Sequence, residues 1–133
     1  MRTIFLDTVG LIALWDKTDQ WRPAANAARA ALHAPGIRMV TTSLVLLECG
    51  NAAARKPYRL EVCQLRDRLR DRGNLISPME AEVEQAWENY RRDRAAGASI
   101  VDHVSFVVMR RLGITDAFTN DQHFKTAGFN TLF

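Results

Sequence analysis

The stretch Thr3-Ile4-Phe5-Leu6-Asp7-Thr8-Val9-Gly10-Leu11-Ile12-Ala13-Leu14 decides the fold class of this chain. Its first part, Thr3 to Leu6, is a short apolar run that predicts a buried strand. Its last part, Val9 to Leu14, has helical spacing and predicts a short helix. Asp7 lies between the two, where a buried segment gives way to a helix. An unpaired charge is costly to remove from water, so Asp7 is a candidate functional residue.

The same alternation of strand and helix continues along the chain. Further strands are predicted at Arg38–Thr42, Leu75–Ile76, Ala117–Thr119 and, as an edge strand, Asn130–Phe133. Further helices are predicted from about Trp21 or Pro23 to His33, from Ser43 to about Arg55, at Arg59–Arg72, from Ser77 to Gly97, at Ser99–Leu112 and at Gln122–Ala127. This alternation predicts an α/β fold with a central parallel sheet of four to five strands. Ligands bind beyond the carboxyl ends of the strands in such sheets.

Two helix starts have specific signals. Ser43 is predicted to cap the helix that follows the second strand. The stretch Ser77-Pro78-Met79-Glu80 offers a cap residue, a proline and a glutamate in the order typical of a helix start. Val83, Ala86, Trp87 and Tyr90 form the predicted apolar stripe of that helix.

Composition narrows the class of protein. A length of 133 residues predicts a single domain over 1–133, and 47% hydrophobic residues suffice for a core. We expect a cytoplasmic protein without a membrane span, because no apolar run approaches about 20 residues. The net charge is +3, and arginine outnumbers lysine 15 to 3. Arginine suits phosphate, but a compositional bias explains the excess equally well, so charge supports nucleic-acid binding only weakly.

Four acidic residues lie beside predicted core segments: Asp7, Glu48, Asp102 and Asp121. Asp7 and Asp121 follow predicted strands, and Glu48 lies in the helix after another strand, so three of the acids fall near one sheet edge. Converging carboxylates would repel one another unless a divalent cation neutralised them. Mg²⁺ and Mn²⁺ prefer oxygen ligands. The sequence therefore favours a metal-dependent phosphodiester hydrolase.

Each acid except Glu48 also has a purely structural interpretation. Asp7 could cap the helix near Val9, and Asp121 could cap the one at Gln122. Asp102 fits a capping box with Ser99.

No capping role explains Glu48, whose helical face also carries Asn51 and Arg55. The histidines His33, His103 and His123 lack metal-binding spacing and are interpreted as structural or surface residues.

Four stretches resemble the motifs of PIN-domain ribonucleases, in the family's order. They are Asp7-Thr8-Val9-Gly10-Leu11-Ile12-Ala13-Leu14, Thr41-Thr42-Ser43-Leu44-Val45-Leu46-Leu47-Glu48 with Asn51, Ser99-Ile100-Val101-Asp102-His103-Val104-Ser105-Phe106, and Ala117-Phe118-Thr119-Asn120-Asp121-Gln122-His123-Phe124. Small PIN proteins of this length resemble the toxin half of VapBC toxin–antitoxin pairs. Val9 stands where the family often has serine, and Val101 where it often has threonine.

The resemblance implies a three-layer α/β/α fold, endonucleolytic cleavage of RNA, a homodimer and a small antitoxin that blocks the site. It implies that Asp7, Glu48, Asp102 and Asp121 hold Mg²⁺ or Mn²⁺. Thr119 and Asn51 would support the site by hydrogen bonding. Asp116 is a fifth acid nearby, and the Thr-x-Asp pattern favours Asp121 over it as a ligand.

Two other functions remain open at this point. An α/β phosphatase acting on a small phosphoester would share the metal site but would need a specific pocket. A PIN-like module that binds RNA or protein without cutting would be expected to have lost one or more of the acids, and all four are present.

Overall fold

A five-stranded sheet, in which every neighbouring pair of strands is parallel, forms the centre of the molecule. The computed structural model describes residues 1–93 and 97–133. The strands are β1 (Arg2–Leu6), β2 (Ile37–Thr42), β3 (Leu75–Ile76), β4 (Asp116–Phe118) and β5 (Asn130–Thr131). Their order across the sheet is β3-β2-β1-β4-β5. The central strand β1 is the one predicted from the opening stretch, and Ile4 and Phe5 are fully buried in it.

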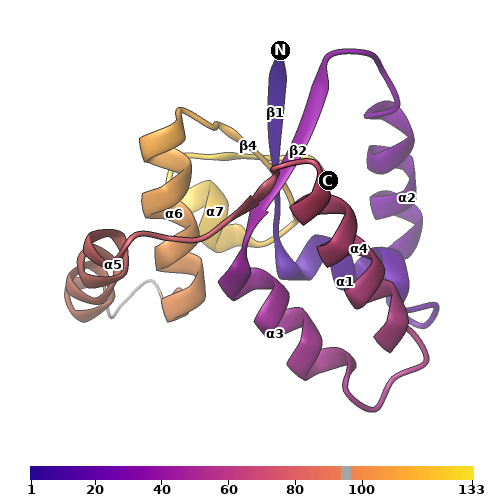
Figure 1. The fold of residues 1–133 in the computed structure, drawn as a ribbon, viewed down its shortest axis with the longest axis horizontal. Coiled ribbons are helices and arrows are strands. Elements are labelled where there is room, and N and C mark those ends of the chain that lie inside the picture. Colours follow the sequence, from indigo (N-terminus) through magenta and orange to yellow (C-terminus); the bar gives the residue numbers. More distant parts are fainter. Residues whose placement is uncertain (94–96) are drawn as a thin grey trace.

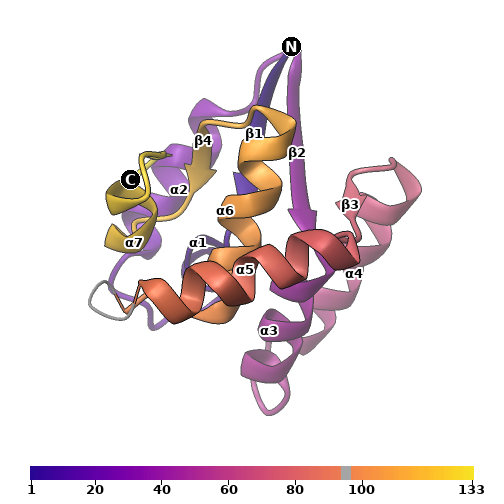
Figure 2. The same cartoon turned by 90° about the vertical axis from the view of Figure 1, so that its left-hand side faces the viewer.

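Helices cover both faces of this sheet. They are α1 (Thr8–Trp15), α2 (Arg22–Ala31), α3 (Ser43–Ala53), α4 (Arg59–Asp71), α5 (Glu80–Arg92), α6 (Ile100–Leu112) and α7 (Gln122–Thr126). Helices α1, α2 and α4 lie on one side of the sheet, and α5 and α6 lie on the other (Figure 1). Figure 2 shows α5 and α6 in front of the strands. The predicted three-layer α/β/α fold is confirmed.

Most predicted element boundaries agree with the structure within two residues, but the caps predicted at Ser43 and Ser77 are displaced. Thr42, not Ser43, caps α3, and its Oγ1 accepts a hydrogen bond from the Val45 amide at 3.2 Å. Helix α5 begins at Glu80, three residues after the predicted cap at Ser77. A buried glutamate fixes that start, because Glu82 Oε1 accepts from the Met79 amide at 2.9 Å.

The tertiary partner of Glu82 explains why sequence reasoning misplaced the start of α5. Arg111 Nε on α6 donates to Glu82 Oε2 at 2.6 Å, so an ion pair between helices holds this carboxylate in place. The helix ends at Arg92 rather than at the predicted Gly97, and residues 94–96 lie outside the described part of the chain.

The predicted apolar stripe of α5 is only partly buried. Ala86 is fully buried against α6, whereas Trp87 and Tyr90 are 46% and 45% exposed. Across the described residues, none of the helices has the length and apolar character that a membrane crossing requires.

Candidate active site

Neighbouring strands bring the first two site residues together. The register of β1 and β4 places Leu6 opposite Phe118, so Asp7 and Thr119 each follow a strand at the same sheet edge. Asp7 is 2% exposed and Thr119 is fully buried. The Thr119 hydroxyl donates to Asp7 Oδ2 at 2.8 Å. This bond fixes the orientation of the Asp7 carboxylate across a sequence separation of 112 residues.

A glycine allows α1 to approach the end of β4 closely. A Cβ atom on Gly10 would lie 2.1 Å from the carbonyl oxygen of Phe118 and 2.6 Å from its ring. Because real Cβ atoms do not come so close to backbone, the packing depends on the absence of a side chain here. Gly10 therefore sets the distance between the helix that follows Asp7 and the strand that precedes Thr119.

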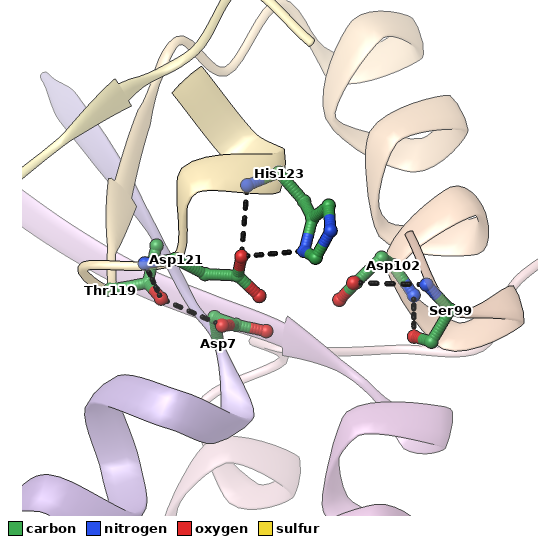
Figure 3. Close-up of polar contacts among 6 residues, drawn as sticks. All are labelled: Asp7, Ser99, Asp102, Thr119, Asp121 and His123. Carbon is green, nitrogen blue, oxygen red and sulfur yellow. Dashed lines mark hydrogen bonds and ion pairs between the residues drawn. The ribbon is translucent and has the colours of Figure 1, made fainter. Parts of the chain in front are cut away.

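Asp102 enters the site from the first turn of α6. Its Oδ2 accepts from the Ser99 amide at 3.2 Å, and its own amide donates to the Ser99 hydroxyl at 3.0 Å. The capping box predicted from sequence is thus confirmed. It holds Asp102, which is 8% exposed, in a fixed orientation. Capping and a role in the site are compatible here, because the box fixes one carboxylate oxygen and the side chain still faces Asp121 and Asp7 (Figure 3).

Asp121 and His123 come from the start of α7. Asp121 Oδ1 accepts from the His123 amide at 2.9 Å, which confirms the predicted cap. The same oxygen lies 2.8 Å from His123 Nδ1. The Thr119 hydroxyl accepts from the Asp121 amide at 3.1 Å, so one threonine orders both this turn and Asp7.

Asp102, Asp121 and His123 form a group that could bind a metal ion. Each offers one ligand atom, and these atoms lie within 4.8 Å of one another. Figure 3 shows the Asp7 carboxylate next to this group, directed toward the same space. Asp7 is the N-cap residue of α1, as the sequence allowed, but its side chain makes no capping hydrogen bond.

Glu48 lies half-buried in α3, the helix that follows β2. Its negative charge is close enough to Asp102 to raise the pKa of that carboxyl, as does the charge of Asp121. Glu48 is not among the described residues whose ligand atoms lie within 4.8 Å of one another, which are Asp102, Asp121 and His123. Its part in holding a metal ion stays a prediction.

Burial and mutual repulsion disfavour the charged state of these acids. Burial raises the pKa of Asp7 from its ordinary value of 3.8 to about 7, and the charges of Asp102 and Asp121 add to this effect. The hydrogen bond from Thr119 acts in the opposite direction. Burial also raises the pKa of Asp102. A cation among these groups would reverse the shifts, because opposite charge favours the ionised form.

The donor set fits a hard divalent cation. Carboxylate oxygens from three elements face one space, and such oxygens suit Mg²⁺ and Mn²⁺. Among the described residues, the hydrogen-bond partners of the buried Asp7 include a threonine hydroxyl but no basic side chain. A buried charge in this position requires compensation.

Two residues named from sequence lie apart from the acids. Asp116 begins β4, at the opposite end of the strand from Thr119. It binds Arg2 Nε at 2.9 Å and Asn130 Nδ2 at 3.0 Å, and these partners lower the pKa of its carboxyl. Asp116 therefore ties three strands together and leaves the site to Asp121. Asn51 is exposed, and no hydrogen bond among the described residues joins it to the acids.

His123 is the site residue that sequence reasoning missed. It was interpreted as structural or surface because no second histidine or cysteine stands at metal-binding spacing. The available signal was its position two residues after Asp121 at a helix start, where a side chain can return to the capping carboxylate.

Comparison with known proteins agrees with these motifs. The sequence model of the PIN domain family matches residues 4–130. The 23S rRNA-specific endonuclease VapC20 of Mycobacterium tuberculosis is 48% identical over 46 residues, which are 35% of this chain and 35% of that protein. The aligned segment thus spans about a third of that relative's length.

Solved structures extend the similarity over nearly the whole chain. The crystal structure of Mycobacterium tuberculosis VapC20, described as a Sarcin-Ricin loop cleaving toxin, superposes with a TM-score of 0.81 and 28% identity, covering 95% of both chains. VapBC-1 from nontypeable Haemophilus influenzae has a TM-score of 0.65 and 18% identity, covering 97% of this chain and 96% of that one. At that identity the second likeness concerns the fold alone. With the family match over residues 4–130, the chain belongs to the PIN domain family.

Proposed function

We propose that this chain is a metal-dependent endoribonuclease of the cytoplasm, the toxin of a type II toxin–antitoxin pair. The observation that supports this most directly is the convergence of buried Asp7 with Asp102 and Asp121, in which the described hydrogen-bond partners of Asp7 include no lysine or arginine. Membership in the PIN family and the likeness to an rRNA endonuclease point to the same activity.

In this proposal the four acids bind the metal ion, and two neighbouring side chains orient them. Asp7, Glu48, Asp102 and Asp121 would hold Mg²⁺ or Mn²⁺, which when bound would lower the pKa of a water and stabilise charge on the phosphate. Thr119 orients Asp7 through its 2.8 Å bond, and His123 orients Asp121 through Nδ1. Hydrogen bonds of this kind fix the geometry of ligating carboxylates. With water as the nucleophile, the reaction needs no serine, cysteine or lysine nucleophile.

A metal titration with RNA as substrate tests the activity. The purified chain is stripped with EDTA, and RNA cleavage is followed as Mg²⁺ or Mn²⁺ is added. We expect cleavage that depends on the metal, with new RNA ends carrying a 5′-phosphate. Asp102→Asn should abolish it, whereas the matched control Asp71→Asn, an exposed aspartate on α4, should leave it unchanged.

The same experiment separates the two alternatives. A phosphatase for small phosphoesters would hydrolyse para-nitrophenyl phosphate and leave RNA intact. A module that only binds would retain RNA without cutting it at any metal concentration. Either result would refute the endoribonuclease proposal.

The antitoxin would occupy a large groove on the side of the sheet that α1, α2 and α4 cover. This groove of about 790 Å³ lies between α1, α2, α4 and β2, and its floor is apolar. Five arginines line it: Arg22, Arg29, Arg38, Arg68 and Arg72. No aspartate or glutamate is among the lining residues. An apolar floor with arginines fits an amphipathic partner segment that carries acidic residues.

We also propose a homodimer. Leu47 on α3 and Leu60 on α4 are 65% and 70% exposed, and these two helices pack together. Exposed leucines in such a position are suited to a second copy of the chain. Sedimentation analysis of wild type against Leu47→Asp and Leu60→Asp would show a dimer that the variants lose, and a wild-type monomer would refute this part of the proposal.

A further inference from the structure

A second pocket opens beside the acids, between α5, α6 and α7. Its volume is about 390 Å³, which is within the range of small-ligand sites. His123, which holds Asp121, forms part of its wall. The pocket and the acidic group thus share a side chain. Figure 2 shows the three helices on the same side of the molecule.

A buried imidazole in this pocket has unused hydrogen-bonding capacity. His103 is 4% exposed, and its Nε2 has no hydrogen-bond partner among the described residues. Asp93 Oδ2 lies 3.5 Å from this nitrogen and does not form a hydrogen bond with it. Buried polar atoms are nearly always satisfied, so an unsatisfied one requires an explanation. A ligand atom that enters the pocket would supply the missing partner.

The pocket also offers fixed positive charge. Arg110 donates from one terminal nitrogen to the Ala127 carbonyl at 3.0 Å, and its guanidinium lies over the rings of Phe106 and Phe129, 5.9 and 5.3 Å from their centres. These contacts hold the side chain in place while other N–H groups of the guanidinium stay available. Arg92 lines the same pocket from α5. Asp93 is the one carboxylate among the lining residues that the structure describes, so the arginines outnumber it.

From these observations we propose that the pocket binds one nucleotide unit of the RNA, next to the bond that is cleaved. An edge atom of the base meets His103 Nε2, and the phosphate meets Arg110 and Arg92. This rests on the proposed function, because the occupant is a part of its substrate. The physical reason is electrostatic. The carboxylates repel RNA, so the strand needs cationic groups close by to remain near them.

Binding of single nucleotides tests the pocket without any cleavage. The four nucleoside 5′-monophosphates are titrated in EDTA into the full chain, and the imidazole signals of His103 are followed by NMR. We expect at least one nucleotide to shift these signals in a saturable manner. Ribose 5-phosphate, which lacks the base, should bind about tenfold or more weakly, as expected for the loss of one base contact.

Two variants with a matched control separate the contacts. Arg92→Ala should weaken nucleotide binding severalfold, whereas Arg91→Ala should not. Arg91 has the same charge on the same helix, but it pairs with Glu88 and does not line the pocket. His103→Phe keeps an aromatic ring and removes Nε2. It should reduce the advantage of the nucleotide over ribose 5-phosphate, followed here at the imidazole signals of His123, which also lines the pocket.

The possible failures are distinguishable. If no nucleotide shifts His103, or if ribose 5-phosphate binds equally well, the nucleotide pocket is refuted even when the wild type cleaves RNA. Equal effects of Arg92→Ala and Arg91→Ala would also refute it. If RNA is not cleaved at any metal concentration, the proposed function fails, and the nucleotide titration still decides whether the pocket binds a nucleotide.

Discussion

Replacing Asp7 with asparagine should stabilise the metal-free protein, and the gain should increase with pH. The Asp7 carboxyl has a pKa of about 7 in the folded chain, against an ordinary value of 3.8. The folded protein therefore holds this proton more tightly than the unfolded chain does. Folding stability falls as pH rises from about 4 through 7, because the unfolded chain releases the proton first.

The size of the effect follows from that difference. One pKa unit corresponds to about 1.36 kcal/mol. Above pH 7 the ionised Asp7 thus costs the folded state about 4 kcal/mol. At pH 5 only part of this cost is present, about 2 kcal/mol. Asparagine resembles the protonated acid in shape, and its side-chain oxygen can still accept from Thr119.

Urea denaturation in EDTA at pH 5 and pH 8 measures this. The free energy of unfolding of Asp7→Asn should exceed that of the wild type by about 2 kcal/mol at pH 5 and about 4 kcal/mol at pH 8. Asp71→Asn, an exposed aspartate, should change stability by less than about 0.5 kcal/mol at either pH. Adding Mg²⁺ should reduce the difference in free energy of unfolding between Asp7→Asn and the wild type, because a cation that binds the folded wild type stabilises it by mass action.

One result would refute the reasoning. If the wild type and Asp7→Asn have equal stability at pH 8, or if their difference does not increase between pH 5 and pH 8, Asp7 does not carry an uncompensated buried charge. Its assignment to the metal site would then lose its electrostatic basis.

Three other perturbations address the site and its partner. Gly10→Ala should lower the free energy of unfolding by about 1–3 kcal/mol and reduce RNA cleavage, because the added Cβ would collide with the Phe118 carbonyl. A variant as stable as the wild type would show that α1 can shift freely. Thr119→Val should keep the fold and reduce RNA cleavage at a fixed Mg²⁺ concentration, since Asp7 loses the hydroxyl that orients it. If the dependence of cleavage on Mg²⁺ is the same in the variant and the wild type, Thr119 does not orient a metal ligand. The double variant Arg68→Glu with Arg72→Glu should lower the affinity of the chain for the antitoxin, measured by calorimetry. The control Arg66→Glu, which lies outside the groove, should leave this affinity unchanged. If the double variant and the control bind the antitoxin equally well, the antitoxin binds another surface.

A cationic side chain of the antitoxin should also replace the metal among the acids. The charges that raise the pKa of Asp7 would attract an arginine, whose planar fork can engage two carboxylates. Each arginine of the antitoxin is replaced in turn by alanine, and the complexes are purified. At least one of these variants should restore RNA cleavage by the complex. A complex that stays inhibited with every such variant would show that inhibition does not use this contact.

The sequence alone determined the fold class, because hydrophobic spacing is a local property that both strands and helices display directly. The strand Thr3–Leu6, the capping box of Ser99 with Asp102 and the cap of Asp121 could all be predicted, since each involves neighbours within a few residues. The PIN resemblance likewise follows from motifs in order along the chain, and the family match confirms it.

Only the tertiary structure decided which polar groups meet. The register of β1 with β4 joins Thr119 to Asp7 across a sequence separation of 112 residues, and the ion pair of Arg111 with Glu82 sets the start of α5. Asp116 and Asp121 are five residues apart, yet one lies at the beginning of a strand with Arg2 and the other past its end beside His123. Contacts between distant segments depend on strand order and register, for which a single sequence carries no local signal.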